Sequence, residues 1–416
     1  MRARLIPAAL AIRHELGLIV CRCLNVSGSL AAAGTGRDEG GESPPVAHVS
    51  LRILQLRVRV AAGPLAYTRP VTTAIDPSRE QDVASALLAY LRRRLGAPAL
   101  TYAEPPRPLG RGTSSFIYAF RLAGTPDEGE WARSLVLRLV WGDGAGAVLE
   151  REAAIQRYVG EHGGATLDLL ALEPSRESEL GLPFTVAERI MGGTLLDAAK
   201  RAPLSIPRLV AAMADAHVAL HRIPVECSPL PYDAPLVDRR IEDWRRRLGV
   251  DGPDELLRGL GWLEEHAGRV RHEEPAICHH DFHPLNVLVG DGNRLVVIDW
   301  SDAVIGDRNS DVARTAMLLL FARLGASSAA ERLALRVVGT VFRARYLARY
   351  RRQLPIDDGR MRYWEAAHAF NGWLQLVELR ARGAAAPQLQ LEMVQQFTPG
   401  LVDEVRRHFW RSTQRS

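Results

Sequence analysis

The chain has 416 residues and a mass of 45.8 kDa, with 47% hydrophobic and 24% charged residues. These values are typical of a globular protein of two or three packed units, and they exclude wholesale disorder and fibrous classes. The net charge is +5, and Lys200 is the one lysine among 53 basic residues. Nine arginines and five acidic residues in 1–78 leave only +1 for residues 79–416, so we expect no nucleic-acid partner.

The cysteines and the apolar segments indicate a cytoplasmic protein without a membrane partner. Of the four cysteines only Cys21 and Cys23 are close in sequence, so neither a disulfide framework nor a four-cysteine zinc site is expected. No run reaches the roughly 18 apolar residues that a membrane-spanning helix needs. Residues 1–12 imitate a secretory signal, but residues 13–15 interrupt it and no small-residue cleavage pattern follows at once.

Residues 1–76 are predicted to be a flexible or disordered N-terminal extension. Within them, residues 26–46 are small, polar and rich in Gly and Ser. The spacing of Ser78 and Gln81 then predicts a capping box, and apolar residues follow at helical spacing until Gly96. We therefore expect order to begin at residue 77.

Strands dominate the residues that follow. Strands are predicted at 116–122, 134–141 and 184–191, with one helix at 147–159. In the first strand Phe116, Tyr118, Phe120 and Leu122 alternate and share one face. The segment LGRGTSS, residues 109–115, lies between two strands, and its small residues let backbone N–H groups approach a phosphate.

Arg138 and Glu152 are predicted to form an ion pair. Arg138 lies among apolar strand residues, where an unpaired charge is costly. Glu152 lies on the same helix face as Val148 and Ile155. A buried arginine and a buried glutamate need each other, although such a pair can also be purely structural.

The second half of the chain is predicted to be mainly helical. Helices are expected at 207–221, 310–324, 330–352, 360–381 and 389–411, and the exception is a short strand pair at 287–289 and 295–298. This order predicts an α+β fold of two lobes. The small β-rich N-lobe would comprise residues 77–191, and the larger helical C-lobe residues 192–416.

The densest chemistry lies around that strand pair. Residues 290–294 have a turn composition, and the hairpin that they predict pairs residue 287 with residue 298. Asn286 and Asp299 would then face each other just outside the hairpin, with Cα atoms roughly 5 Å apart. Their side-chain oxygens suit Mg²⁺, which keeps several waters and shares phosphate oxygens.

Asp281 lies five residues before Asn286, near enough to address the same ligand. One carboxylate can then orient a hydroxyl and accept its proton while the other two groups hold a metal on a phosphate. An alternative is a non-heme iron site built from residues 278–283 with His368 or His408. That alternative leaves Asn286 and Asp299 unexplained, and it competes with a structural role for His279 and His280 in anchoring the loop.

The motif His279-x-Asp281-x4-Asn286, followed by Asp299 after an apolar strand, resembles the catalytic and metal-binding loops of the protein-kinase-like fold. The wording HHDFHPLNVLV…VIDWSDAVIGDRNSDVA is similar to the aminoglycoside phosphotransferase and choline kinase branch, over roughly residues 80–400. This resemblance implies that Asp281 is the catalytic base and that Asn286 and Asp299 hold Mg²⁺.

The same resemblance assigns the supporting residues. It implies that Asp311, together with His279, gives structural support to the catalytic loop. It also implies that Arg138, in place of the commoner lysine, holds the α- and β-phosphates of the nucleotide. The expected nucleotide-binding residues are Gly112, Ser114, Arg138, Glu152, Glu188 and Ile190, the last two through backbone groups near the adenine.

The expected function is that of an ATP- and Mg²⁺-dependent phosphotransferase that moves the γ-phosphoryl group to a hydroxyl of a small molecule. The segment DRRIEDWRRR, residues 238–247, is basic, whereas a polycationic aminoglycoside calls for acidic walls. A small-metabolite kinase of the choline or homoserine type is therefore an alternative. A nucleotide-binding pseudoenzyme is another, because Arg138 and Ser115 depart from the family's usual lysine and asparagine. Neither ATP over GTP nor an oligomeric state follows from these residues.

Overall fold

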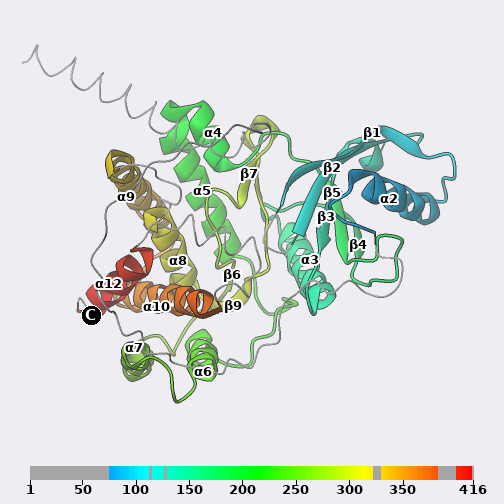
Figure 1. The fold of residues 1–416 in the computed structure, drawn as a ribbon. Helices are drawn as coiled ribbons and strands as arrows, with labels where there is room; N and C mark the ends of the chain where they lie inside the picture. Colours follow the sequence, from blue (N-terminus) through cyan, green and yellow to red (C-terminus); the bar gives the residue numbers. More distant parts are fainter. Residues whose placement is uncertain (1–74, 112–114, 126–128, 322–328, 383–399, 415–416) are drawn as a thin grey trace, which may run out of the picture.

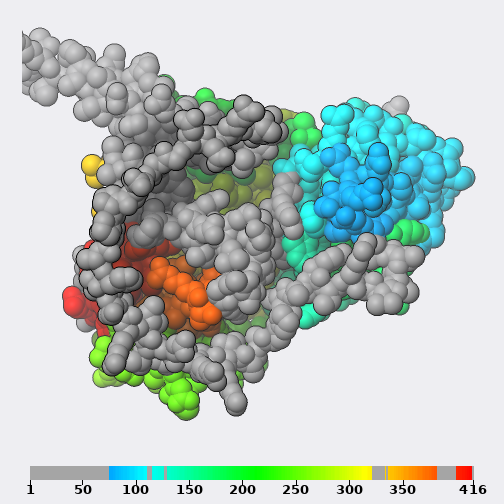
Figure 2. All heavy atoms as spheres, in the orientation of Figure 1, coloured from blue at the N-terminus to red at the C-terminus, as the bar shows by residue number. Residues whose placement is uncertain are grey.

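The computed structural model describes residues 75–111, 115–125, 129–321, 329–382 and 400–414 (Figure 1). The predicted extension, residues 1–76, lies outside the described residues except for its last two. The described chain forms a β-rich N-lobe beside a helical C-lobe (Figures 1 and 2), so the predicted two-lobed α+β fold is confirmed. The lobe boundaries at 77–191 and 192–416 stay a prediction.

The N-lobe is one antiparallel sheet of five strands in the order β1-β2-β3-β5-β4. The strands are β1 (Thr101–Arg111), β2 (Ser115–Ala123), β3 (Ser134–Val140), β4 (Leu169–Glu173) and β5 (Phe184–Glu188). Two helices accompany the sheet, α2 (Glu80–Leu95) and α3 (Ala145–Glu161). Short 3-10 helices lie at Glu130–Ala132, Pro203–Ser205, Ala267–Arg269 and Asp291–Asn293.

The alternation predicted for β2 is confirmed. Tyr118, Phe120 and Leu122 are buried in one cluster with the apolar residues of α2, which lies on the outer surface of the N-lobe (Figure 2). The predicted capping box is wrong. Arg79 precedes the helix, and the Ser78 hydroxyl donates instead to Asp76 Oδ1 at 2.6 Å, because a local turn competes for it. Gly96 ends α2 as expected, with φ +61°.

The C-lobe is built from eight α-helices within the described residues, beginning with a short one after Gly192-Gly193. They are α4 (Leu195–Arg201), α5 (Ile206–His221), α6 (Leu236–Leu248), α7 (Asp254–His266), α8 (Arg308–Phe321), α9 (Ala329–Arg351) and α10 (Asp358–Arg382), with α12 (Leu401–Thr413) following the undescribed stretch 383–399. The helical predictions are confirmed for the described residues. The strand predicted to reach residue 191 ends at Glu188, where the chain leaves the sheet.

Two hairpins carry the loops between these helices. One is β7 (Val287–Val289) with β8 (Leu295–Val297), and the other is β6 (Pro275–Cys278) with β9 (Val304–Asp307). The second hairpin is a correction, because a single strand pair was expected in this half. Its strands are four residues long and 25 residues apart by sequence number, so no local turn signals it.

The predicted register of the first hairpin is wrong by one residue. Val287 pairs with Val297 rather than Ile298, because Gly290 N–H donates to Arg294 C=O at 2.8 Å and closes the turn one residue earlier. Ile298 N–H then donates to Asn286 C=O at 3.0 Å. Asn286 therefore stands opposite Ile298, and Asp299 lies one residue beyond it.

The two lobes meet through backbone contacts with this hairpin. Thr194 forms a β-bridge with Leu288, and Thr166 forms one with Val297. Val289 N–H donates to Gly193 C=O at 2.9 Å. The connector between the lobes is thus joined to the strands that carry the candidate site. In the described part of the chain, no helix combines the length and apolar character that crossing a membrane would require.

Gly192 lies so close to β7 that a side chain does not fit. A Cβ built there would stand 1.6 Å from Val289 O. We expect Gly192→Ala to lower the free energy of unfolding by about 1–3 kcal/mol, measured by urea denaturation, because backbone must shift to relieve the clash. Gly261→Ala on α7 is the matched control, since no atom lies within 4 Å of its Cβ. Equal stability of the two variants would contradict this account.

Candidate functional site

Asp281 and Asn286 are in direct contact on the loop between β6 and β7. The Asn286 side-chain amide donates to Asp281 Oδ2 at 2.7 Å and to its backbone carbonyl at 3.0 Å. Asp299 follows the residue that stands opposite Asn286 in the hairpin. The Ser301 hydroxyl donates to Asp299 Oδ1 at 2.8 Å. Three oxygen-bearing groups thus gather at the open end of β7 and β8.

The carboxylate of Asp281 is held in its ionised form. Burial acts to raise its pKa, but the hydrogen bond and charge of His283, with the charges of Arg314 and His279, outweigh it, so the pKa lies below its ordinary value. His283 Nε2 is 3.3 Å from Asp281 Oδ2. Because Leu285 N–H donates to His283 Nδ1, the proton of that ring belongs on Nε2, facing the carboxylate.

The loop that presents Asp281 has an unusual backbone. His280 and Asp299 have φ values of +58° and +64°, and Asn293 is the third such non-glycine residue in the described chain. A left-handed conformation costs about 1–3 kcal/mol in residues other than glycine and persists only where surrounding contacts hold it. His280 directly precedes Asp281 and Asp299 is itself a residue of the candidate site, so the contacts that hold His280 also set the direction of Asp281.

Asp311, at the start of α8, provides them. Its carboxylate accepts the backbone N–H of His279 at 2.5 Å and that of His280 at 2.9 Å. His279 extends the support, because its Nδ1 accepts Asp281 N–H at 3.2 Å and its Nε2 lies 3.1 Å from Ile298 C=O. The ring therefore joins the Asp281 loop to the strand that ends at Asp299.

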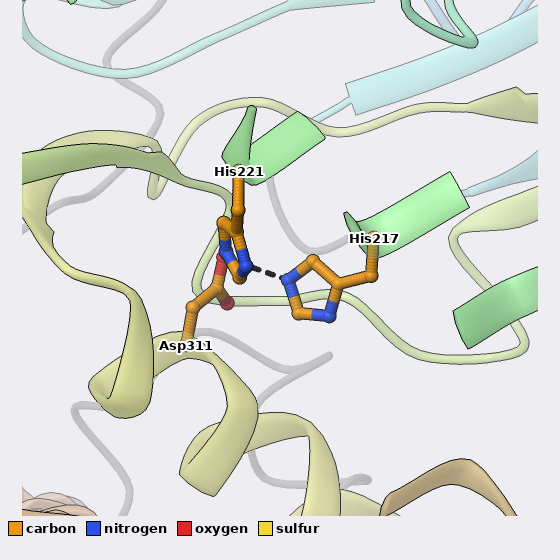
Figure 3. A group of neighbouring side chains, drawn as sticks. All are labelled: His217, His221 and Asp311. Carbon is orange, nitrogen blue, oxygen red and sulfur yellow. Dashed lines mark hydrogen bonds and ion pairs between the residues drawn. The ribbon is translucent and has the colours of Figure 1, made fainter. Parts of the chain in front are cut away.

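Two buried histidines complete the surroundings of Asp311 (Figure 3), and sequence reasoning missed them. His217 and His221 both come from α5, and their Nε2 atoms lie 3.0 and 3.2 Å from Asp311 Oδ2. Their Nδ1 atoms lie 2.6 Å from the hydroxyls of Tyr346 and Tyr350. Their spacing of four residues places both on one face of a helix, and this pattern could have indicated from the sequence that they contact a shared partner.

This buried cluster has ligand atoms close enough to hold a metal ion, but its contacts are those of a hydrogen-bonded brace. Each imidazole lies between a tyrosine hydroxyl and the carboxylate, and His221 is hydrogen-bonded on both sides. His217 Nε2 lies 3.0 Å from Asp311 Oδ2 without a hydrogen bond of good geometry. The charges and hydrogen bonds of His217 and His221 overcome the effect of burial and hold the pKa of Asp311 well below its ordinary value. The carboxylate thus stays ionised and keeps its grip on the loop.

Arg138 and Glu152 meet as predicted. Arg138 Nη1 lies 3.1 and 3.0 Å from the two carboxylate oxygens of Glu152. Burial raises the pKa of Glu152, Arg138 opposes this, and the charge of Asp299 adds to the increase, so the pair lies within electrostatic reach of Asp299. The prediction that Val148 shares the buried face is wrong, since its side chain is 41% exposed.

The remaining nucleotide-binding candidates lie at the lobe connector or outside the described residues. Glu188 ends β5 and its carboxylate is 3.4 Å from Arg133. Ile190 lies two residues further on, and within the described chain its backbone groups form no hydrogen bond to protein. Gly112 and Ser114 lie outside the described residues.

The alternative iron site is not assembled. Among the described residues, the one group of three or more His, Cys, Asp or Glu ligands is His217, His221 and Asp311, and it contains neither Asp281 nor His283. His368 instead faces the backbone carbonyl of Ser310 at 2.8 Å. By contrast, an amide oxygen from Asn286 and a carboxylate from Asp299 form a hard-oxygen donor set that fits Mg²⁺.

Comparison with known proteins gives one family and one fold. The model of the phosphotransferase enzyme family, APH, matches residues 107–364. A proposed aminoglycoside phosphotransferase from Ralstonia eutropha JMP134 superposes with a TM-score of 0.57 and 19% identity, covering 80% of this chain and 98% of that chain. These likenesses extend to two further crystal structures.

The first is a thermostable mutant of aminoglycoside phosphotransferase APH(4)-Ia in a ternary complex with ADP and hygromycin B. Its TM-score is 0.52 at 19% identity, with 78% of this chain and 98% of that chain covered. The second is the GDP complex of an aminoglycoside 2'-phosphotransferase IIIa variant, with a TM-score of 0.52 at 18% identity and coverage of 79% and 99%. At such identities the likeness shows a shared fold.

The His217 ring makes stability depend on pH. Burial lowers its pKa to about 4, His221 acts in the same direction, and Asp311 opposes both. An unfolded histidine titrates near 6.5, so between these values the unfolded chain binds more protons. We expect the free energy of unfolding to fall as pH is lowered from about 6.5 to about 4, with about 3 kcal/mol due to this ring.

Urea denaturation at several pH values checks this dependence. His217→Gln should show a shallower fall in unfolding free energy over that pH range than the unsubstituted protein. His272→Gln is the matched control, because His272 is exposed on the surface. If both variants keep the original slope, His217 is not the group responsible.

Proposed function

Because the chain belongs to the phosphotransferase enzyme family, we propose that it transfers the γ-phosphoryl group of ATP, with Mg²⁺, to a hydroxyl group of a small molecule. The observation that carries the proposal is the contact of Asp281 with Asn286 beside Asp299, on a loop that Asp311 braces. A base, two metal ligands and a fixed loop are the parts that phosphoryl transfer requires.

Asp281 orients the acceptor hydroxyl and takes its proton. The hydroxyl oxygen forms a bond to the γ-phosphorus, the bond from that phosphorus to the bridging oxygen breaks, and ADP leaves with the bonding electron pair. A lowered pKa makes Asp281 a weak base. Such a base suffices, because the transition state of phosphoryl transfer is loose and depends mainly on positioning and charge.

Asn286 and Asp299 are the residues that would hold Mg²⁺. When bound, the ion would neutralise charge on the nucleotide phosphates. The hydrogen bond that Asn286 donates to Asp281 orients its amide so that the side-chain oxygen is left to face a ligand. The Ser301 hydroxyl fixes one oxygen of Asp299 in the same way.

Arg138 is placed to contact the phosphates of the nucleotide. Glu152 binds the guanidinium through Nη1 alone. In the described chain Nη2 and Nε of Arg138 have no other protein partner, so an edge of the planar group remains for phosphate oxygens. A guanidinium grips such oxygens at two points, whereas a lysine offers a point charge. ADP and hygromycin B bound to APH(4)-Ia support a nucleotide and a small molecule as ligands.

Removing the carboxylate of Asp281 tests the reaction. An acceptor is first found by following ADP release in a screen of aminoglycosides, choline, homoserine and sugars. With the best acceptor, Asp281→Asn should lower kcat by about 10²–10⁴-fold, because the hydroxyl loses its base, while Mg·ATP still binds. Asp291→Asn in the exposed turn is the control. A kcat near that of the unsubstituted protein would refute the role of Asp281.

Removing the carboxylate of Asp299 tests the metal site. Mg·ATP at about 100 times its Kd should stabilise the unsubstituted protein by about 2.7 kcal/mol in thermal unfolding, and Asp299→Ala should lose this stabilisation. EDTA added to the unsubstituted protein should have the same effect. Stabilisation by Mg·ATP without turnover of any acceptor would favour the pseudoenzyme. Iron dependence without a response to nucleotide would exclude both nucleotide-based functions.

A further inference from the structure

A cavity of about 110 Å³ lies in the C-lobe beside the candidate catalytic loop. Its walls come from α6, α8 and α10, together with His280 and Asp302 from the two loops of the site. His280 directly precedes Asp281. Burial raises the pKa of Asp302, and the charge of Asp281 raises it further, so the cavity lies within electrostatic reach of the proposed base.

Three arginines line this cavity, and only one of them has a carboxylate partner. Arg247 pairs with Glu378 at 2.8 Å and Asp243 at 3.3 Å. Across the described residues, neither Arg240 nor Arg314 has a carboxylate oxygen within 4.0 Å. Burial lowers the pKa of Arg240, and the charges of Asp302 and Asp243 oppose burial without outweighing it. Two partly buried guanidiniums without a close ion pair are costly, because nearby negative charge only partly replaces their lost hydration.

Both guanidiniums instead contact His280. Arg240 Nη2 lies 3.2 Å from His280 Nδ1, and Arg314 Nε donates to the His280 carbonyl at 3.3 Å. Burial lowers the pKa of His280 to about 3, with Arg240 and Arg314 acting in the same direction. The ring is therefore neutral and accepts the hydrogen bond from Arg240. His280 thus draws the two guanidiniums together, and among the described residues no other hydrogen bond or ion pair occupies their N–H groups.

Resting on the phosphotransferase function proposed above, we propose that Arg240 and Arg314 bind an oxyanion of the acceptor, which is therefore a hydroxyl compound that carries a carboxylate or a phosphate. Guanidinium groups match both oxyanions in shape and charge. The cavity is large enough for a carboxylate or phosphate group. The rest of the acceptor, with its hydroxyl, would extend from the cavity toward Asp281.

The remaining walls agree with this assignment. Asp302 is the one carboxylate of the lining, and the charges of Arg240 and Arg314 both act on it. The indole N–H of Trp244 is already bonded to Asn371, and that of Trp364 to Asp307, so neither indole donor is free for a ligand. A polycationic acceptor would place amines beside the charges of Arg240 and Arg314, where like charges repel.

Anion binding is tested first with the nucleotide site filled. Thermal unfolding of the full chain with saturating Mg·AMP-PNP is followed against inorganic phosphate, malonate and spermidine at constant ionic strength. We expect phosphate or malonate to stabilise the protein and spermidine not to. Arg240→Gln and Arg314→Gln should each weaken that binding about 10- to 100-fold, as expected for one charged hydrogen-bonding group.

Matched variants separate charge from structure. Arg314→Lys should retain part of the anion binding, because it keeps the charge. Arg246→Gln should retain all of it, since Arg246 lies on the same helix as Arg240 but its side chain is 71% exposed and pairs with Asp243. The subsite is overturned if Arg240→Gln and Arg314→Gln both leave anion binding unchanged. It is also overturned if neither phosphate nor malonate stabilises the unsubstituted protein.

Acceptor kinetics give the second test. Glucose 6-phosphate, glucuronate, glucose and glucosamine form a panel that differs in charge on one framework. If the enzyme phosphorylates an anionic acceptor, Arg240→Gln should raise KM for that acceptor about 10- to 100-fold more than it lowers kcat. For a neutral acceptor, KM and kcat should not respond in this unequal way. Whether the acceptor with the phosphate or the one with the carboxylate has the lower KM identifies the preferred oxyanion. If no sugar reacts, the anion-binding result decides.

The outcomes distinguish this inference from the function on which it rests. Turnover of a cationic acceptor whose KM is unchanged by Arg240→Gln overturns the subsite and leaves the phosphotransferase function intact. Absence of both Mg·ATP binding and turnover overturns the function. Arginine-dependent anion binding in such a protein would still establish the subsite as an anion site.

Discussion

The carboxylate of Asp311 is the constraint on which the candidate site depends. It accepts two successive backbone N–H groups of the candidate catalytic loop and faces two imidazoles of α5. These contacts hold His280 in a left-handed conformation that an isolated chain disfavours. Asp281 follows directly, so its direction is set by a buried charge on α8. Placing Asp281 correctly therefore requires that α5 and α8 be packed against the loop.

Arginine chemistry at the site follows from a chain with a single lysine. At Arg138 the planar group is held by Glu152 through Nη1 and leaves an edge that would face phosphate in the proposed function. At Arg240 and Arg314, which form no ion pair within the described part of the chain, two guanidiniums line a cavity beside the proposed base. The arginines of residues 238–247 thus have two roles: some form ion pairs at the surface, and others line the cavity.

Local patterns predicted most of the fold, and the errors have local physical causes. Helical periodicity located α5, α8, α9 and α10, and alternation located β2. The register of the β7–β8 hairpin was wrong by one residue because the turn closes between Gly290 and Arg294. The capping box failed because Asp76 captured the Ser78 hydroxyl. The proximity of Asp281 and Asn286 was expected because they lie five positions apart, but their direct hydrogen bond was not.

The sequence by itself determined the two-lobed plan and the spacing of Asp281, Asn286 and Asp299, because periodicity and short loops act between near neighbours. Tertiary structure decided the buried brace and the cavity. The tyrosines of α9 reach the histidines of α5 across 129 positions, and Arg240 reaches His280 across 40. Such contacts form only when helices pack, because no local pattern specifies which distant side chains will share a dry interior or which charges will lack a partner.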